Sequence, residues 1–327
     1  MNLKKKIEEK GFYLIAEIGN NHEGNLSLAK KMIAKAHEAG ADAIKLQFIV
    51  PETFISKENE NRFKYLKKVC FNRNQVIKLY KFAKKKKIEI FSSIFDHNYL
   101  NFFSKKQKIF KIASGDNDLE IYYKNISKFK KTTLISTGLT EKEDIKKIYK
   151  YIDKYWSKKF SNENICVMHC VSDYPTKKKD LNLNYIKKIP IKYIKGFSDH
   201  SVGINACSIA FTLGAKVIEK HFTLNKKDKF SRDHALSADP KDLKKLVKNL
   251  NSLKIILGNG EKKLTVGEKK NYKSIRRSPV SLKFLKKGTK LRSKDIAFLR
   301  PRKTKSIDSN YLKSRLIKKD IMKLEIL

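Results

Sequence analysis

Eight short apolar segments, rich in β-branched and aromatic residues, alternate along the chain with longer segments of helical periodicity. The strand-like segments span residues 12–18, 43–48, 88–94, 109–114, 132–137, 165–170, 193–198 and 216–222. Helices are expected over residues 26–39, 73–87, 141–155, 180–188, 203–213 and 240–256. Parallel strands joined by crossover helices explain this alternation, and eight such units predict an α/β fold of the (β/α)8 TIM-barrel type.

Polar side chains lie at or just after the carboxyl end of each strand-like segment. They are Glu17, Lys45, Gln47, Ser92, Ser93, Lys111, Ser114, Ser136, Thr137, His169, Ser172, Ser198, Asp199, His200, Glu219 and His221. In a closed barrel these strand ends converge on one face, where enzymes of this fold place their chemistry. A loop role explains any single serine, but a lysine inside a buried strand needs an anionic partner. A bound anion would supply that partner.

The residue types at these strand ends indicate a class of reaction. Lys45, Lys111 and the nearby serines suit a phosphate or carboxylate group. His200 and His221 follow neighbouring strands and fit a shared divalent metal ion, because neutral imidazole binds Mn, Co or Zn. Carboxylates that provide bases or support the metal are Glu17, Asp116, Glu219 and Asp233. Together these residues predict a metal-assisted reaction of a small phosphorylated or carboxylated anion.

The charge of the chain is strongly positive. The 327 residues include 75 Lys and Arg against 33 Asp and Glu, a net charge of +42. Such a field attracts any polyanion, but the lysines are spread in short runs without a zinc-finger or RNP-like motif. A solvated lysine-rich surface is therefore favoured over specific nucleic-acid binding. Reduced thiols are expected for the four cysteines, and a cytoplasmic location without membrane contact is expected because no signal peptide or long apolar stretch is present.

The sequence changes character after Leu257. A polar, glycine-bearing stretch is followed by short strand-like segments without a long helix, and LKKGTKLRSKDI (285–296) is weakly echoed by IKKDIMKLEIL (317–327). We expect a barrel domain over residues 1–258, a linker over 259–273 and a small, mostly β domain over 274–327. A module of this size is only marginally stable by itself, so it is expected to dock.

Several motifs, in order along the chain, resemble the sialic acid (N-acetylneuraminate) synthase family. They are AEIGNNHEG (16–24), GADAIKLQ (40–47), FKIASGD (110–116), ISTG (135–138), HCVSDYPT (169–176), GFSDHSVG (196–203), GAKVIEKHFTL (214–224) and RDHALS (232–237). The tail resembles the antifreeze-like (SAF) domain of that family through KKGTKLRSKDI (286–296) and LRP (299–301). The resemblance implies a barrel plus an SAF domain, in a homodimer whose SAF domains each cap the partner's barrel.

The implied reaction joins phosphoenolpyruvate to the open-chain aldehyde of an N-acetylmannosamine-type sugar and releases phosphate. The resemblance implies that His200 and His221 hold Mn, Mg or Co, which polarises the aldehyde, and that Glu17 and Asp116 position or deprotonate a water. The implied phosphoenolpyruvate ligands are Lys45, Ser92, Lys111, Ser114, Ser136 and Ser198, with Lys45 and Lys111 also catalytic. The implied sugar-side residues are Gln47, Tyr174, Glu219, Asp233 and, from the partner subunit, Arg300.

Two alternatives remain open from the sequence. The first is a synthase of legionaminic or pseudaminic acid, whose substrate carries a second acetamido group. The second is a catalytically inactive barrel that binds polyanions. The chain also departs from the family pattern: Asp116 stands where some members have Glu, and Leu324 stands where a turn glycine is expected. His234 is expected to order its own loop.

Overall fold

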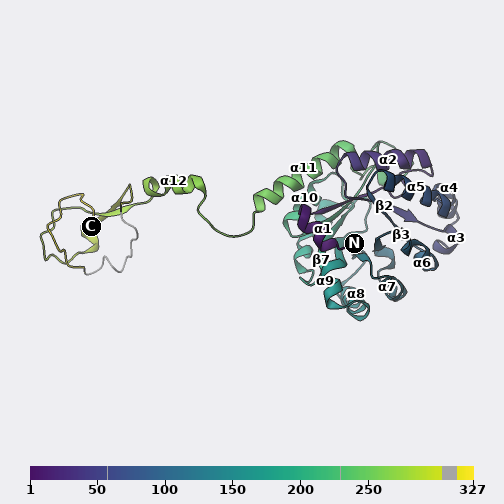
Figure 1. Cartoon of the computed structure of the whole chain (residues 1–327), viewed down its shortest axis with the longest axis horizontal. Coiled ribbons are helices and arrows are strands. Elements are labelled where there is room, and N and C mark those ends of the chain that lie inside the picture. Colours follow the sequence, from purple (N-terminus) through teal and green to yellow (C-terminus); the bar gives the residue numbers. More distant parts are fainter. Residues whose placement is uncertain (57, 229, 304–314) are drawn as a thin grey trace. The chain divides into compact units, whose positions relative to one another are not determined.

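The computed structural model describes residues 1–56, 58–228, 230–303 and 315–327, which form two compact units, Met1–Gly258 and Asn259–Leu327 (Figure 1). The first unit contains eight parallel strands. They are β1 (Tyr13–Glu17), β2 (Ala43–Phe48), β3 (Glu89–Ile94), β4 (Ile109–Ile112), β5 (Thr132–Ser136), β6 (Ile165–Cys170), β7 (Ile194–Asp199) and β8 (Val217–His221). The predicted (β/α)8 barrel is confirmed.

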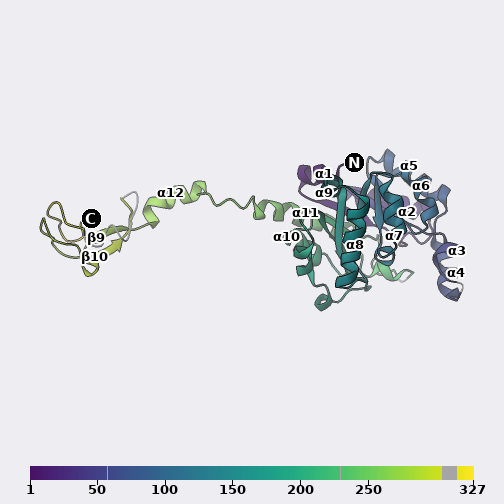
Figure 2. The same ribbon diagram turned by 90° about the horizontal axis from the view of Figure 1, so that it is seen from below.

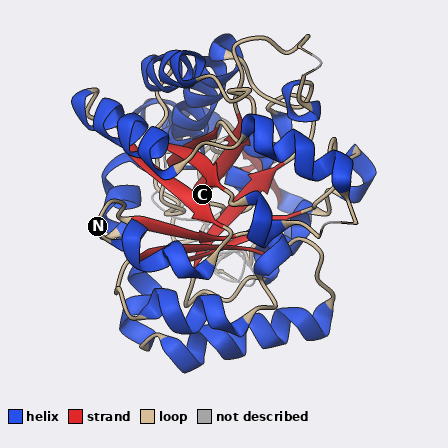
Figure 3. Cartoon of the chain, turned by 90° about the vertical axis from the view of Figure 1, so that its right-hand side faces the viewer, coloured by secondary structure: helices blue, strands red, loops and turns tan. Residues whose placement is uncertain are grey.

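The strands form a nearly closed barrel surrounded by helices (Figure 3). Their hydrogen-bonded order is β3-β2-β1-β8-β7-β6-β5-β4, so β3 and β4 meet at a seam. Within the described residues no backbone ladder joins these two strands, and the side chain of Gln107, two residues before β4, bonds to β3 instead. Its Nε2 donates to the Ser92 carbonyl at 3.2 Å, and its Oε1 accepts from the Ser92 N–H at 3.0 Å.

The helices of the first unit lie around the strands (Figures 1 and 2). They are α1 (Leu3–Lys10), α2 (Leu26–Glu38), α3 (Pro51–Phe54), α4 (Glu60–Val69), α5 (Arg73–Lys85), α6 (Leu100–Ser104), α7 (Glu120–Ser127), α8 (Lys142–Tyr155), α9 (Lys158–Asn164), α10 (Asn205–Thr212) and α11 (Pro240–Leu257). The helix expected over 180–188 is wrong, because Asn182 adopts a left-handed conformation and only 3-10 turns form at Lys178–Asp180 and Leu183–Lys188. Among the described residues, none of the helices is apolar enough over a sufficient length to cross a membrane.

Alternation along the strands divides the barrel interior into two layers. Successive strand residues point to opposite faces, so every second residue faces inward. The layer nearer the amino ends of the strands is apolar and comprises Tyr13, Ile15, Ala43, Phe91, Ile109, Leu134, Cys166, Met168, Ile194 and Val217. Leu3 and Ile7 of α1 join this layer and close that end of the barrel. On six of the eight strands the next inward position is charged or carries a hydroxyl, as Glu17, Lys45, Ser93, Lys111, Ser136 and Glu219, which places the site at the carboxyl ends.

The second unit is small and contains α12 (Val266–Ile275), which lies partly in the stretch expected as a linker, and an antiparallel pair, β9 (Ser278–Ser281) and β10 (Ile296–Leu299). Its core consists of Leu285, Leu291, Ile317 and Ile321. The two segments of the weak internal repeat pair with each other, because Leu285 and Ile321 exchange both backbone hydrogen bonds. Leu324, at the position where glycine was expected, has a φ of 66°.

Candidate active site

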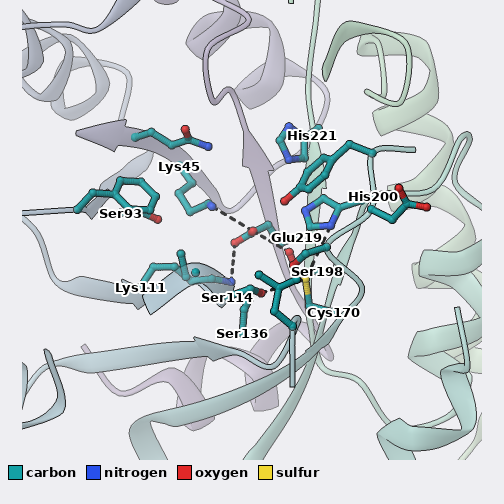
Figure 4. Close-up of a pocket in the computed structure, with 18 of the residues that line it drawn as sticks. Lys45, Ser93, Lys111, Ser114, Ser136, Cys170, Ser198, His200, Glu219 and His221 are labelled. Carbon is teal, nitrogen blue, oxygen red and sulfur yellow. Dashed lines mark hydrogen bonds and ion pairs between the residues drawn. The ribbon is translucent and has the colours of Figure 1, made fainter. Parts of the chain in front are cut away.

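A buried network of two lysines and two glutamates forms the floor of the site. Figure 4 shows three of its members, Lys45, Lys111 and Glu219. Glu219 on β8 accepts from Lys45 on β2 at 3.1 Å and from Lys111 on β4 at 3.2 Å. Lys45 also pairs with Glu17 on β1 at 3.0 Å, and Ser198 on β7 donates to Glu219 at 2.9 Å. Five strands of the barrel therefore converge on one cluster of charges.

The two carboxylates of this network have opposite electrostatic environments. Burial raises the pKa of Glu17 to about 7; the nearby Glu219 carboxylate also raises it, and Lys45 only partly opposes the shift. Burial alone would raise the pKa of Glu219 too, but the Lys111 and Lys45 ammonium groups outweigh it and hold this pKa well below its usual range. Glu219 is thus the fixed negative charge, while Glu17 changes its protonation state near neutral pH.

Lys111 is the less completely paired of the two lysines. Besides Glu219, its ammonium contacts, among the residues that the structure describes, only the weakly accepting Met168 sulfur, at 3.0 Å. Burial lowers the pKa of Lys111, and the neighbouring Lys45 ammonium also acts in that direction. An anion in the cavity would add the missing acceptors, so Lys111 is suited to hold a phosphate or carboxylate group.

A cavity of about 390 Å³ lies above the network. The expected site residues that line it are Lys45, Gln47, Lys111, Ser114, Ser136, Tyr174, Ser198, His200, Glu219 and His221. Buried polar atoms without a hydrogen-bond partner in the described part of the chain include three on lining residues: Ser93 Oγ, Ser172 Oγ and His221 Nδ1. Because a buried polar atom without a partner is costly, these atoms indicate that the cavity is built for a polar ligand.

The two histidines fit a shared metal ion. Their ring centroids are 5.3 Å apart, and His200 Nδ1 donates to the Val171 carbonyl at 2.8 Å. A carbonyl only accepts, so Nδ1 of His200 carries a proton, and the neutral form of this imidazole presents the Nε2 lone pair to a metal, in the arrangement typical of metal-binding histidines. Burial, and then the neighbouring His200, lower the pKa of His221 well below its usual value, which keeps this imidazole neutral.

The mouth of the site is formed by loops. The Tyr174 ring lies against His200 with centroids 4.2 Å apart, and the Arg232 guanidinium lies 5.1 Å above the Tyr174 ring. Asp233 Oδ2 is 3.8 Å from His221 Nδ1. Gln47, Tyr174, His221 and Arg232 line both the main cavity and an adjoining one of about 330 Å³, which Asp233 and Arg62 also line.

Four expected site residues line neither cavity. Glu17 is fully buried on β1 and contacts the cavity-lining residues Lys45 and Gln47. Ser92 points away from the barrel interior and contacts Tyr80 Oη at 2.9 Å, so its expected place in the cavity is wrong. Asp116 does not line the cavity; burial and the nearby Asp118 raise its pKa to about 6. Arg300 is an exposed residue of the second unit.

Sequence reasoning gave no role to several lining residues, Cys170 and Arg232 among them, and chose the wrong serine on β3. Ser93, the neighbour of Ser92, faces the cavity because it has the same parity on β3 as the inward-facing Phe91. Arg232 was quoted within a motif but was given no role. Cys170, which follows Cys166 and Met168 on the inward face of β6, also lines the cavity. Alternation of inward-facing and outward-facing residues along β3, counted from Phe91, would have identified Ser93 as the serine that faces the cavity.

A model of the NeuB family matches residues 32–262, which is more than half of the chain. The chain belongs to the NeuB family. The N,N'-diacetyllegionaminic acid synthase of Legionella pneumophila is 32% identical over 305 residues, covering 88% of this chain and 85% of that protein. The pseudaminic acid synthase of Campylobacter jejuni is 33% identical over 312 residues, covering 90% and 88%.

A solved structure of the NeuB type supports the same assignment. The N-acetylneuraminic acid (sialic acid) synthetase of Leptospira borgpetersenii, crystallised with citrate, superposes with a TM-score of 0.73 at 31% identity. The match covers 80% of this chain and 90% of that one. The resemblance to sialic acid synthases is therefore confirmed, and so is the interpretation of this NeuB chain as an enzyme.

Proposed function

We propose that this enzyme condenses phosphoenolpyruvate with the open-chain aldehyde of an N-acylated hexosamine, releasing phosphate and forming a nine-carbon 2-keto acid. The observation that carries the proposal is the convergence of Lys45 and Lys111 on Glu219 beneath a cavity that His200 and His221 also line. One end of this cavity suits a small multivalent anion, and the other suits a metal ion and an aldehyde. Both substrates of the reaction are thereby accommodated.

Phosphoenolpyruvate binds at the cationic floor. Lys111 and Lys45 face its phosphate and carboxylate groups, and hydroxyls of Ser93, Ser114, Ser136 and Ser198 complete the contacts. Ser93 replaces the originally expected Ser92. These groups are fixed on strand ends, so they hold C3 of the substrate in place for attack on the aldehyde.

His200 and His221 would hold a divalent ion, Mn, Mg or Co, and this ion supplies Lewis-acid polarisation of the aldehyde oxygen when bound. Asp233 lies beside His221, where its carboxylate accepts a proton from a sugar hydroxyl or a water. Tyr174 covers the two imidazoles and limits access of bulk water.

Glu17 serves as the group that orients and deprotonates the water that captures C2 of phosphoenolpyruvate. Its pKa of about 7 suits proton transfer at neutral pH, and the amide of Gln47 donates to its Oε1 at 3.0 Å. Its other oxygen pairs with Lys45, which also faces the anion. Glu17 therefore holds the attacking water next to the bound phosphoenolpyruvate, because the same Lys45 contacts both Glu17 and the substrate.

A second candidate substrate is a 2,4-diacetamido-2,4,6-trideoxyhexose, which would make the chain a legionaminic or pseudaminic acid synthase. The names of the relatives from Legionella pneumophila and Campylobacter jejuni favour this candidate. In either case the second unit acts as an SAF domain of a cytoplasmic homodimer, and Arg300 of one subunit contacts the sugar's N-acyl group in the partner's barrel.

The deciding experiment measures phosphate released from phosphoenolpyruvate when each candidate sugar and Mn²⁺ are added in turn. The proposal predicts release only when enzyme, sugar and metal are all present, with a product whose mass equals the condensed acid. The mass of the product from a sugar panel distinguishes the two candidate sugars. Absence of release with every sugar and metal would contradict the proposal and favour a polyanion-binding protein.

A further inference from the structure

Three electron-rich side chains converge near the mouth of the barrel, outside the His200–His221 pair. Glu23 belongs to the turn between β1 and α2, whereas Asp228 and His234 belong to the long segment between β8 and α11. One ligand atom from each of the three lies within 4.8 Å of the others. His234 Nε2 is 3.4 Å from Glu23 Oε1, and the His234 side chain is 3% exposed.

The hydrogen bonds around His234 define which of its nitrogens carries the proton. Thr223 Oγ1 lies 2.7 Å from His234 Nδ1 and donates its own hydrogen to the Asn225 carbonyl at 3.2 Å. A hydroxyl has one hydrogen, so Thr223 must accept from His234 Nδ1–H. In the neutral imidazole Nε2 then carries the lone pair. This atom is buried, has no hydrogen-bond partner among the described residues and lies 3.4 Å from Glu23 Oε1.

A lone pair facing two carboxylates is unfavourable, and either a proton on Nε2 or a metal ion bound between the three groups removes the repulsion. Within the described residues, no Lys or Arg forms an ion pair with Glu23 or Asp228. Both carboxylates are only partly buried, so water can complete a coordination shell. The Thr223 hydroxyl supports the imidazole from behind, as carbonyls and hydroxyls do behind metal-binding histidines.

We propose that Glu23, Asp228 and His234 form a second divalent-metal site, separate from His200 and His221. Two carboxylates and one neutral imidazole suit Mn²⁺ or Zn²⁺, with water in the remaining positions. The ion ties the turn after β1 to the segment that carries Arg232 and Asp233. It therefore holds the mouth residues in place and takes no part in the reaction.

The test counts metal ions on the full-length protein after removal of bound metal with a chelator. In a Mn²⁺ titration followed by EPR of the free ion, the unaltered chain binds two ions. Asp228→Asn and a His200→Ala/His221→Ala double variant each retain one ion, and the variant combining all three changes retains none. Glu60→Gln, which alters an exposed carboxylate of α4 outside the cluster, keeps both ions and serves as the matched control.

A second pair of variants tests the support behind His234. Thr223→Val removes the hydroxyl at nearly constant side-chain volume. It is expected to lower the affinity for the second ion by about tenfold, as loss of such a supporting hydrogen bond does at other metal sites. Thr223→Ser retains the hydroxyl and retains the affinity. Circular dichroism of each variant confirms that the fold is kept.

Protease protection provides a readout independent of metal counting. Saturating Mn²⁺, at about 100 times its dissociation constant, slows tryptic cleavage after the exposed Lys227 by about 100-fold if cleavage needs local opening. Asp228→Asn abolishes that protection. The proposal is overturned if Asp228→Asn and Glu23→Gln bind two ions with unaltered affinity, or if the unaltered chain binds a single ion that is lost in His221→Ala. Neither result bears on phosphate release, so this proposal and the proposed reaction fail independently.

Discussion

At the scale of single residues, the contacts of a buried lysine distinguish one that stabilises the fold from one that serves the reaction. Lys220 on β8 is fully buried and pairs with Asp199 at 2.9 Å on the outer side of the strand, where it stabilises the fold. Lys45 and Lys111 share Glu219 and line a cavity. Burial alone therefore does not identify an active-site lysine. The distinguishing feature is that Lys45 and Lys111 share one carboxylate and line a cavity.

Replacing Lys111 with Ala is expected to reduce kcat/KM for phosphoenolpyruvate by roughly 30- to 1000-fold. A desolvated charge contact contributes about 2–4 kcal/mol to a transition state, which corresponds to that factor. Phosphate release at varied phosphoenolpyruvate concentration measures the effect. Lys108→Ala, which removes an exposed lysine immediately before β4, is the control and leaves kcat/KM unchanged. A reduction below about threefold would place Lys111 outside the reaction.

The pH dependence of turnover is expected to follow Glu17. Its carboxyl has a pKa raised to about 7 by burial, so the basic form is lost as pH falls through that value and kcat/KM declines on the acidic side. Glu17→Gln removes this limb of the profile and leaves a slow, pH-independent rate. Asp116→Asn retains the limb because, in the described part of the chain, Asp116 forms no ion pair with Lys45 or Lys111, whereas Glu17 pairs with Lys45. A profile that instead changed with Asp116→Asn would assign the base to Asp116.

Removal of divalent metal is expected to abolish turnover, and Mn²⁺, Co²⁺ or Mg²⁺ is expected to restore it. His221→Ala should remain folded, because a single imidazole at the cavity wall contributes little to the core, but should show no metal-dependent phosphate release. Chelation and metal addition, with circular dichroism as the folding check, make the measurement. Full activity in His221→Ala would refute the assignment of this ligand.

At the scale of secondary-structure elements, alternation along the strands decides which side chains reach the site. The strand positions were predictable from sequence because each is a short apolar run, and parity along β3 was sufficient to choose Ser93 over Ser92. Two features were not predictable. The 3-10 turns over 178–188 replace an expected helix, and Gln107 resembles an ordinary loop residue in sequence although its side chain bonds to β3 at the seam with β4.

Gln107→Ala is expected to destabilise the barrel by about 3 kcal/mol. The substitution leaves the Ser92 N–H and carbonyl without their partner, and Tyr80, which donates to Gln107 Oε1 at 2.7 Å, loses its acceptor. The urea midpoint compared with that of Lys106→Ala, an exposed neighbour, measures the loss. Equal midpoints for the two variants would show that the seam is held by other contacts.

At the scale of the whole molecule, the chemistry belongs to the first unit. Every residue that lines the main cavity precedes Pro240, whereas Arg300 lies in the second unit. The motifs identified the family and nearly all of the cavity, because they lie at strand ends. The sugar's identity was not predictable, because relatives of similar identity are named as synthases of different acids. The role of Arg300 rests on the family resemblance alone, because Arg300 belongs to the second unit and does not line the cavity.

Deleting residues 259–327 is expected to leave phosphoenolpyruvate affinity within about tenfold but to abolish condensation. Binding is measured by calorimetry and condensation by product mass.

A mixture of Arg300→Ala and His221→Ala chains then tests domain exchange, because one intact barrel lies under one intact second unit only if the units are swapped. Recovery of about a quarter to a half of wild-type activity would support the swap. No recovery, in chains shown to exchange subunits, would mean that each unit serves its own barrel or that Arg300 does not contact the sugar.

The floor of the site is built on strands, and its mouth is built on loops. Lys45, Lys111 and Glu219 cannot move without disturbing the barrel, whereas Tyr174, Arg232 and Asp233 lie on segments that tolerate change of length and composition. Evolution can therefore retain the half of the reaction that handles phosphoenolpyruvate while it diversifies the acceptor sugar. The same division provides a route for protein engineering, in which grafting loops between relatives alters the acceptor and leaves the donor chemistry intact.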